Sequence, residues 1–92
     1  MIKTFRHRGL ERFFRTGSLA GIQPKHASRL RLQLGRLDSA QAPRDMDLPG
    51  WRLHRLKGHL AGDWAVWVDE NWRLVFGFDG TNAVRLDYVD YH

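Results

Sequence analysis

A small set of acidic, basic and aromatic side chains in the second half of the sequence has the composition of a site that cleaves RNA. The ribose 2′-OH is an internal nucleophile beside the phosphate, so such a site needs a general base, a general acid for the departing 5′-oxygen and cations for the charge on phosphorus. Histidine commonly transfers protons near neutral pH, and tyrosine can stack an unpaired base. The residues of these types that we single out are His54, Lys57, Arg73, Asp90, Tyr91 and His92.

The sequence alone leaves the division of roles within this set open. His54, Lys57 and Asp90 are all candidates for the general base. His92 is the candidate for the general acid. Lys57 and Arg73 are the candidate cations for the charge that develops on the phosphate.

Each of these residues also has a purely structural interpretation. His54 fits a half-buried strand histidine, and Tyr91 either stacks a base or covers an edge of the core. Arg73 could instead pair with Asp69 or Asp87. Residue types by themselves therefore suggest the chemistry without assigning it.

The sequence gives little sign of a metal or a cofactor. His54, His59 and His92 are a conceivable ligand set, but no helical pair of histidines four residues apart with an intervening glutamate is present. The absence of cysteine excludes disulfides, thiolate nucleophiles and Cys-based metal sites. A Gly-rich phosphate loop and a serine in the Gly-x-Ser-x-Gly pattern are also missing. We therefore expect neither a metal nor a cofactor.

The charge distribution favours a nucleic acid or an acidic protein as partner. Lys and Arg total 15 against 10 Asp and Glu, and most of these cations are arginine, which suits forked contacts with phosphate. Residues 1–46 hold ten cations and three anions, whereas residues 47–92 hold five and seven. A solvated arginine-rich surface is the alternative. The residues that we assign to a surface for a nucleic acid or an acidic protein partner are Arg8, Arg12, Arg15, Lys25, Arg29 and Arg36.

Two amphipathic helices are expected to carry these basic residues. A helical period over residues 8–16 puts the apolar side chains on one face and arginines on another, and Gly17 is a natural left-handed stop. A second helix is expected to open at Pro24 and to run to about Ser39, again with one apolar and one basic face.

The rest of the sequence is typical of antiparallel strands joined by tight turns. Within residues 72–78, every second side chain is large and apolar (Trp72, Leu74, Phe76 and Phe78), and these are expected to point toward the helices. Arg73 is therefore expected to project from the opposite face of the sheet, which the helices leave open. A loop with two prolines, 41–50, precedes these strands. The expected strands cover residues 2–5, 51–56, 63–68, 72–78 and 83–89.

Residues 1–92 are therefore expected to form one α+β domain in the order β-α-α-β-β-β-β, with a largely antiparallel, twisted sheet and two helices packed on one face. Hydrophobic residues make up 42% of the chain, which supplies one core, and the length leaves no room for a second. No apolar run approaches the length of a membrane span, and the start of the chain lacks the apolar stretch of a signal peptide. A cytoplasmic location is expected.

The sequence resembles the HigB-type toxins of the RelE superfamily, the mRNA interferases of bacterial toxin–antitoxin pairs. The most specific shared element is the terminal Asp-Tyr-His at 90–92, set behind a strand that contains Trp72-Arg73. The Leu-x-x-Leu-Lys-Gly corner at 53–58 is next. The matching segments follow the family's order and spacing across nearly the whole chain: 1–5 with Gly9-Leu10, 53–58, 71–76 and 90–92.

This resemblance implies a compact RelE-like fold and endonucleolytic cleavage of mRNA, usually in the ribosomal A site during translation. The products would carry a 2′,3′-cyclic phosphate and a 5′-OH. It also implies a helix-turn-helix antitoxin of the HigA kind as partner, with contact to operator DNA only through that antitoxin and none to a membrane. Arg73 lies where a phosphate-contacting arginine is common in the family. The residues that match the family's active site are His54, Lys57, Asp90, Tyr91 and His92.

Two other functional classes compete with a ribonuclease toxin. One is a non-catalytic RNA- or ribosome-binding module that uses the same basic helices without turnover. The other is a DNA-binding regulator that acts only together with its partner. The presence of every candidate catalytic residue favours the ribonuclease.

Overall fold

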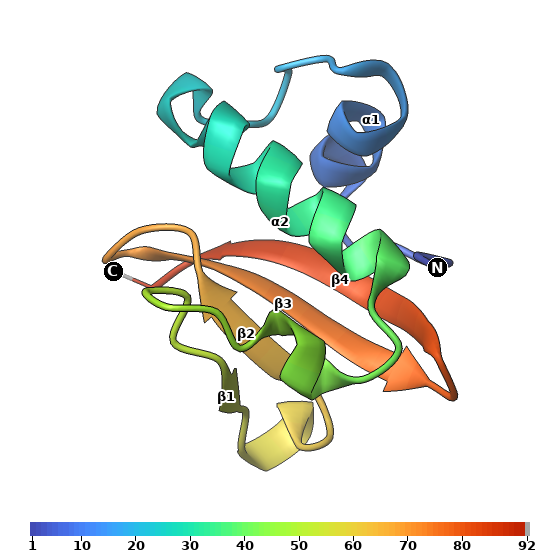
Figure 1. Ribbon diagram of the computed structural model, residues 1–92. Helices are drawn as coiled ribbons and strands as arrows, with labels where there is room; N and C mark the ends of the chain where they lie inside the picture. The colour runs from blue at the N-terminus through green and yellow to red at the C-terminus, as the bar shows by residue number, and fades with distance from the viewer. Residues whose placement is uncertain (92) are drawn as a thin grey trace.

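Two helices lie across one face of a four-stranded antiparallel sheet (Figure 1). The structure is a computed structural model that describes residues 1–91. Three short 3-10 helices, η1 to η3, occupy the connections. The elements are α1 (Arg8–Thr16), η1 (Pro24–His26), α2 (Ala27–Ser39), η2 (Pro43–Met46), β1 (His54–Arg55), η3 (Gly58–Leu60), β2 (Trp64–Trp67), β3 (Trp72–Asp79) and β4 (Asn82–Asp90).

Helix α1 has the bounds that its sequence pattern predicts. The Nδ1 atom of His7 accepts a hydrogen bond from the backbone N–H of Leu10 (2.9 Å), which caps the start of the helix. Gly17 ends it with a left-handed backbone, φ 79°. Leu10 and Phe13 are buried, so α1 contributes its apolar face to the core.

The second predicted helix is divided into η1 and α2, because the first turn after Pro24 is of the tighter 3-10 type. Leu30, Leu34 and Leu37 form its buried stripe, as expected from their spacing. Gln33 is buried beside them, and its amide N–H donates to the carbonyl of Trp67 (2.8 Å). This bond ties the middle of α2 to the end of β2.

The sheet has the strand order β1-β2-β3-β4, and every neighbouring pair is antiparallel. The expected strand at 2–5 is reduced to two isolated parallel bridges to β4, Ile2 with Ala83 and Phe5 with Leu86. The physical reason is a bulge in β4: the backbone of Arg85 has φ 56°, which interrupts the regular ladder between the two bridges.

The expected strand at 51–56 is shortened to the two residues of β1. Arg52 has a left-handed backbone, φ 52°, which no regular strand accommodates, so pairing with β2 begins only at His54. The loop at 41–50 was expected to be irregular, and it contains the 3-10 turn η2.

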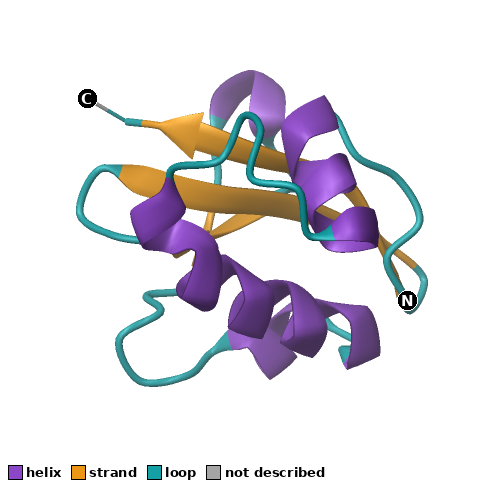
Figure 2. Cartoon of the chain, turned by 90° about the horizontal axis from the view of Figure 1, so that it is seen from above, coloured by secondary structure: helices purple, strands orange, loops and turns teal. Residues whose placement is uncertain are grey.

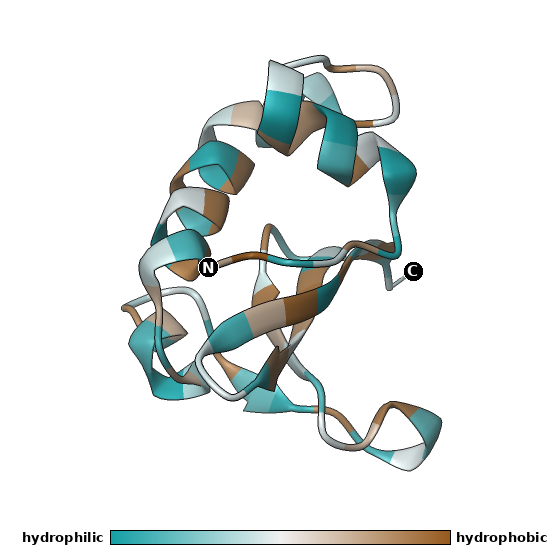
Figure 3. Cartoon of the chain, turned by 90° about the vertical axis from the view of Figure 1, so that its right-hand side faces the viewer, coloured by the Kyte–Doolittle hydropathy of each residue, from teal (hydrophilic) through white to brown (hydrophobic). Residues whose placement is uncertain are grey.

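The core fills the space between the helices and one face of the sheet. Leu74 and Phe76 of β3 face the helices and are fully buried, as the alternation along this strand predicts. A view from above shows α1 and α2 lying over the strands (Figure 2). Both helices carry alternating hydrophilic and hydrophobic segments, as amphipathic helices should (Figure 3). We call the opposite face of the sheet the distal face.

No helix within residues 1–91 is long and apolar enough to cross a membrane.

Candidate active site

The distal face brings several of the predicted site residues into neighbouring rows. His54 pairs with Ala65, Ala65 pairs with Val75, and Val75 pairs with Asp87. Because directly paired residues in a sheet project to the same side, these four side chains form one row across all four strands. Val66 and Leu74, their neighbours in sequence, belong to the core, which places the row on the distal face.

The adjacent row contains Trp67, Arg73 and Val89, which are paired across β2, β3 and β4. Beyond it, the N–H of Tyr91 donates to the carbonyl of Asn71 (2.6 Å), which extends the ladder past the end of β4. Tyr91 therefore follows Val89 on the same face. The distal-face position predicted for Arg73 agrees with this arrangement.

His54 is held by a hydrogen bond that sets its tautomer. Its Nδ1 atom lies 2.9 Å from the carbonyl oxygen of Arg52, which can only accept, so Nδ1 carries the proton. The lone pair of neutral His54 then resides on Nε2. A half-buried histidine whose Nε2 is a proton acceptor has the form that a general base requires.

Arg73 links the turn between β2 and β3 to two aromatic rings. The residue is only 8% exposed, and its Nη1 atom donates to the backbone carbonyls of Asp69 (2.9 Å) and Glu70 (3.1 Å). Its guanidinium carbon lies 4.3 Å from the ring centroid of Trp67 and 5.2 Å from that of Tyr91. This stacking and bonding fixes the guanidinium group beside Tyr91.

Arg52 and Trp67 belong to the same cluster and were missed in the sequence. The guanidinium carbon of Arg52 lies 4.2 Å from the ring centroid of Trp67. Arg52 reaches this ring from the β1 side, whereas Arg73 reaches it from β3. A left-handed backbone at a non-glycine residue stores strain, and such strain is concentrated at functional sites. Residue spacing carries no signal for this contact, because it depends on that unusual backbone.

Lys57 and Asp90, the other predicted catalytic residues that the structure describes, lie outside the two rows of the distal face. Lys57 is exposed at the start of η3 and precedes Gly58, whose φ of 71° makes the corner. Asp90 is exposed as the last residue of β4 and pairs with Trp72, which packs against the core, so its side chain projects to the helix side of the sheet and not to the distal face. His92 lies outside the described residues. The structure thus brings Arg73 and Tyr91 into contact, with His54 in the next row.

Most of the predicted basic surface is exposed, but part of it braces the fold. The Nε atom of Arg36 donates to the carbonyl of Asp45 (2.9 Å), and an Nη2 N–H of Arg29 donates to the carbonyl of Gly50 (3.2 Å). Both arginines therefore hold the 41–50 loop against α2. Arg15 forms an ion pair with Glu11 one turn earlier (3.1 Å). The exposed remainder is Arg8, Arg12 and Lys25.

A buried polar network supports the β2–β3 turn from the side of the helices. His26 is 3% exposed, and its Nε2 lies 2.6 Å from the Asp69 carboxylate. Its Nδ1 lies 2.5 Å from the hydroxyl of Tyr88, which also accepts a bond from the N–H of Gln23. Burial raises the pKa of Tyr88, so the hydroxyl stays protonated and donates to Nδ1.

The carboxyl of Asp69 titrates far below its usual range. Partial burial by itself raises its pKa, but hydrogen bonds from His26 and from the backbone N–H groups of Asn71 and Trp72 outweigh this and lower the pKa to about 2. The carbonyl of the same residue holds Arg73. Asp69 therefore couples the buried network to the stacked cluster on the distal face.

Replacing Asp69 by asparagine is expected to lower the free energy of unfolding by about 1–2 kcal/mol near neutral pH, after allowance for its partial exposure. Because the pKa of Asp69 is lowered in the folded state, this contribution is fully present above the ordinary value of 3.8 and is lost as the pH falls through about 2. The difference in melting temperature between the wild type and Asp69→Asn should therefore shrink over that range. Thermal melts with the exposed Asp47→Asn as control measure it, and a difference independent of pH would contradict the prediction.

Within residues 1–91, no group of three or more histidine and acidic side chains is placed to hold a metal ion. His54 and His59 of the conceivable ligand set fall in this part of the chain, and His92 does not.

Comparisons with known proteins decide the family. The family described as “RelE-like toxin of type II toxin-antitoxin system HigB” matches residues 3–92. The chain belongs to this family. This HigB-like toxin also aligns with the “Endoribonuclease HigB” of Proteus vulgaris, at 36% identity over 92 residues and full coverage of both proteins.

The fold of the HigB-like toxin agrees with a solved structure. The “YoeB/ParE toxin from Agrobacterium tumefaciens” superposes with a TM-score of 0.59, covering 99% of this chain and 96% of that one at 14% identity. At this identity the likeness concerns the fold alone. The expected RelE-like α+β fold is confirmed, and so is the identification of the chain as a HigB-type toxin.

Proposed function

We propose that this HigB-like toxin is an endoribonuclease that cleaves mRNA in the ribosomal A site and thereby inhibits translation. The observation that carries the proposal is the distal face, where a histidine with its proton fixed on Nδ1 lies one row from an arginine stacked between two aromatic rings. These groups are a base, a cation and a stacking surface. The name of the Proteus vulgaris relative, an endoribonuclease, supports the same activity.

In the proposed reaction, Nε2 of His54 accepts the proton of the ribose 2′-OH while the 2′-oxygen attacks the adjacent phosphorus. The bond from phosphorus to the 5′-oxygen breaks, and His92 donates a proton to that oxygen. The products are a 2′,3′-cyclic phosphate and a 5′-OH. Lys57 and Asp90 remain alternatives for the base, and Tyr91 stacks an unpaired base of the message.

Cationic groups on the same face would stabilise the charge that develops on the phosphate. Arg73 is the arginine that the family resemblance assigns to this role, but its Nη1 atom is occupied by backbone carbonyls and the residue is nearly buried. Arg52 is exposed and stacks on the same tryptophan. We therefore add Arg52 to the proposed phosphate-binding groups, with Trp67 as the residue that positions both guanidinium groups.

Replacing Arg52 by glycine is expected to lower cleavage about tenfold without destabilising the fold. Glycine adopts a φ of 52° without strain, so the backbone that orients His54 is kept while the guanidinium group is lost. One charge-assisted hydrogen bond to phosphate is worth about 1.5–3 kcal/mol when fully formed, and less at an exposed position. Single-turnover cleavage and thermal melts measure the two effects.

The control for this variant is Arg55→Ala, which removes an exposed arginine of β1 that stacks on Trp64. Because Arg55 directly follows His54 in β1, its side chain projects to the opposite face of the sheet. If Arg52→Gly cleaves as fast as the wild type, or if Arg55→Ala is equally slow, Arg52 has no specific role in catalysis.

The type II family implies an antitoxin as partner. We propose an antitoxin of the HigA helix-turn-helix kind, contact with operator DNA only through it, and a cytoplasmic site of action on translating ribosomes. The exposed arginines of α1 are candidates for contact with ribosomal RNA on the ground of charge.

Mapping new 5′ ends of mRNA after induction of the gene tests this function. Cuts in codon register across translated regions, with none in untranslated regions, are the expected result for a ribosome-dependent nuclease. Growth arrest without new 5′ ends would favour a non-catalytic ribosome-binding module. Cuts in translated and untranslated regions alike would retain the nuclease and remove the requirement for the ribosome.

A further inference from the structure

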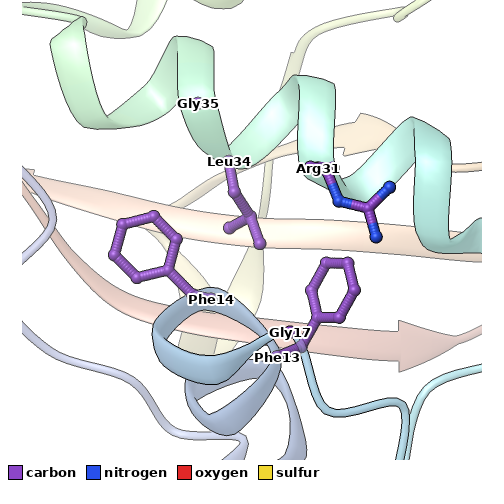
Figure 4. Close-up of a pocket in the computed structure, with 6 residues that line it drawn as sticks. All are labelled: Phe13, Phe14, Gly17, Arg31, Leu34 and Gly35. Atoms are coloured by element: carbon purple, nitrogen blue, oxygen red, sulfur yellow. The ribbon is translucent and has the colours of Figure 1, made fainter.

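The helical layer contains a groove that the proposed chemistry does not use. It lies between α1 and α2, with a volume of about 330 Å³. The side chain of Leu34 points from α2 toward α1 between the rings of Phe13 and Phe14 (Figure 4). Since it is built from the helices, this groove is on the opposite side of the sheet from the distal face. The lining residues are Phe13, Phe14, Gly17, Arg31, Leu34 and Gly35.

Gly35 lowers the stability of α2, and no contact inside the protein explains why a glycine stands there. It lies in the interior of α2, where glycine is less favourable than alanine. Among residues 1–91, apart from its chain neighbours and the backbone of its own helix, no heavy atom lies within 4 Å of a Cβ placed there, so packing inside the protein does not demand the missing side chain. The bare backbone at the groove is what the close approach of a second molecule would need.

The surroundings of the groove define the chemistry of that molecule. The rings of Phe13 and Phe14 and the side chain of Leu34 give the groove an apolar lining. The guanidinium carbon of Arg31 lies 5.5 Å from the ring centroid of Phe13, at the groove itself. Residues 8–39 carry seven cations and two carboxylates. An apolar side chain flanked by carboxylates complements both features.

We propose that the groove between α1 and α2 binds an acidic segment of the antitoxin, with one apolar side chain inserted against Phe13 and Phe14. The segment's backbone would pass over Gly35, and its carboxylates would meet Arg31. This inference rests on the antitoxin partner of the proposed function. A chain bound here leaves the distal face uncovered, so the antitoxin is held by a surface separate from the RNA site.

A protein segment fits the groove better than RNA does. Two phenylalanine rings and a leucine form an apolar lining, which suits an aliphatic or aromatic anchor. RNA binding through phosphates would need several unengaged cations at the groove, and Arg31 is the only one among its lining residues. The arginines of α1 lie on the outer face of that helix, away from Phe13.

The test compares Gly35→Phe with Thr81→Phe, which adds the same ring at an exposed residue of the turn between β3 and β4, outside the helical layer. Binding of the purified, co-encoded antitoxin is measured by titration calorimetry, and cleavage is measured on programmed ribosomes. Gly35→Phe should weaken antitoxin binding at least tenfold and leave cleavage within twofold of the wild type. Thr81→Phe should change neither. Gly35→Ala, which removes the unfavourable glycine, should melt at or above the wild-type temperature and weaken binding less than Phe does.

The outcomes separate the groove from the proposed function. If the wild type binds the antitoxin and Gly35→Phe binds it with the same affinity, the groove is not the antitoxin site, and the toxin–antitoxin function still stands. If Gly35→Phe loses cleavage but still binds the antitoxin, the proposal is overturned, and the groove contacts the ribosome or the message instead. A wild-type chain that does not bind the antitoxin would overturn both proposals.

Discussion

Replacing His54 by asparagine is expected to lower the rate of RNA cleavage by about 10²–10⁴-fold, the usual contribution of general base catalysis. The asparagine amide can still donate to the carbonyl of Arg52, so the short β1 strand should keep its geometry while the proton acceptor at Nε2 disappears. Single-turnover cleavage on programmed ribosomes measures the loss, and circular dichroism confirms that the melting temperature is retained.

The matched control is His59→Asn, which makes the same change at an exposed histidine of η3, five residues further along the chain. It should cleave at the wild-type rate. If His54→Asn remains within a few-fold of the wild type, the general base is Lys57 or Asp90. That result would leave the endoribonuclease activity in place and change only the assignment of the base.

Replacing Gly77 by alanine is expected to destabilise the fold by about 2–4 kcal/mol, because it breaks an ion pair with a buried member. Asp63 is 4% exposed in its side chain, and its Oδ1 accepts from the guanidinium of Arg85 at 2.6 Å. A Cβ at Gly77 would collide with that guanidinium and would lie 2.6 Å from the same carboxylate oxygen. The bonded arrangement exists only because this strand position has no side chain.

A double-mutant cycle separates this mechanism from general strain in β3. Arg85→Gln removes the cation first, and Gly77→Ala added to it should then cost much less than it does in the wild type. For a chain of this size the single change should lower the melting temperature by roughly 8–30 °C, since 1 kcal/mol corresponds to about 4–8 °C. Additive costs would show that the alanine acts on the backbone and not on the ion pair. The guanidinium of Arg6 lies 3.9 Å from the other carboxylate oxygen of Asp63 and offsets part of the loss.

Local signals in the sequence predict the elements whose structure depends on nearby residues. The bounds of α1 follow from its apolar period and from Gly17, and the two faces of β3 follow from simple alternation. The α+β class and the placement of Arg73 away from the helices follow in the same way. These features need no knowledge of which distant segments meet.

Features that depend on contacts between distant segments were missed. The bond from His26 to Asp69 joins residues 43 positions apart, and Gln33 reaches Trp67 across 34 positions. A buried histidine and a buried glutamine within a helical pattern resemble ordinary solvated residues until their partners are known. The left-handed backbone of Arg52, which shortens β1 and creates the contact with Trp67, has no sequence signature of the kind that glycine provides.

The pairing of the N-terminal segment with β4 has a consequence for the order of events during synthesis. Ile2 bridges Ala83 and Phe5 bridges Leu86, so the first segment to be synthesised can pair only after β4, near the end of the chain, has been synthesised. His54, Arg73 and Tyr91 also assemble only through β3 and β4. Chains emerge from the ribosome with their N-terminal part first. A nascent chain therefore has its helices outside the exit tunnel while its distal face is still incomplete, and we expect it to leave the message from which it is being made uncut.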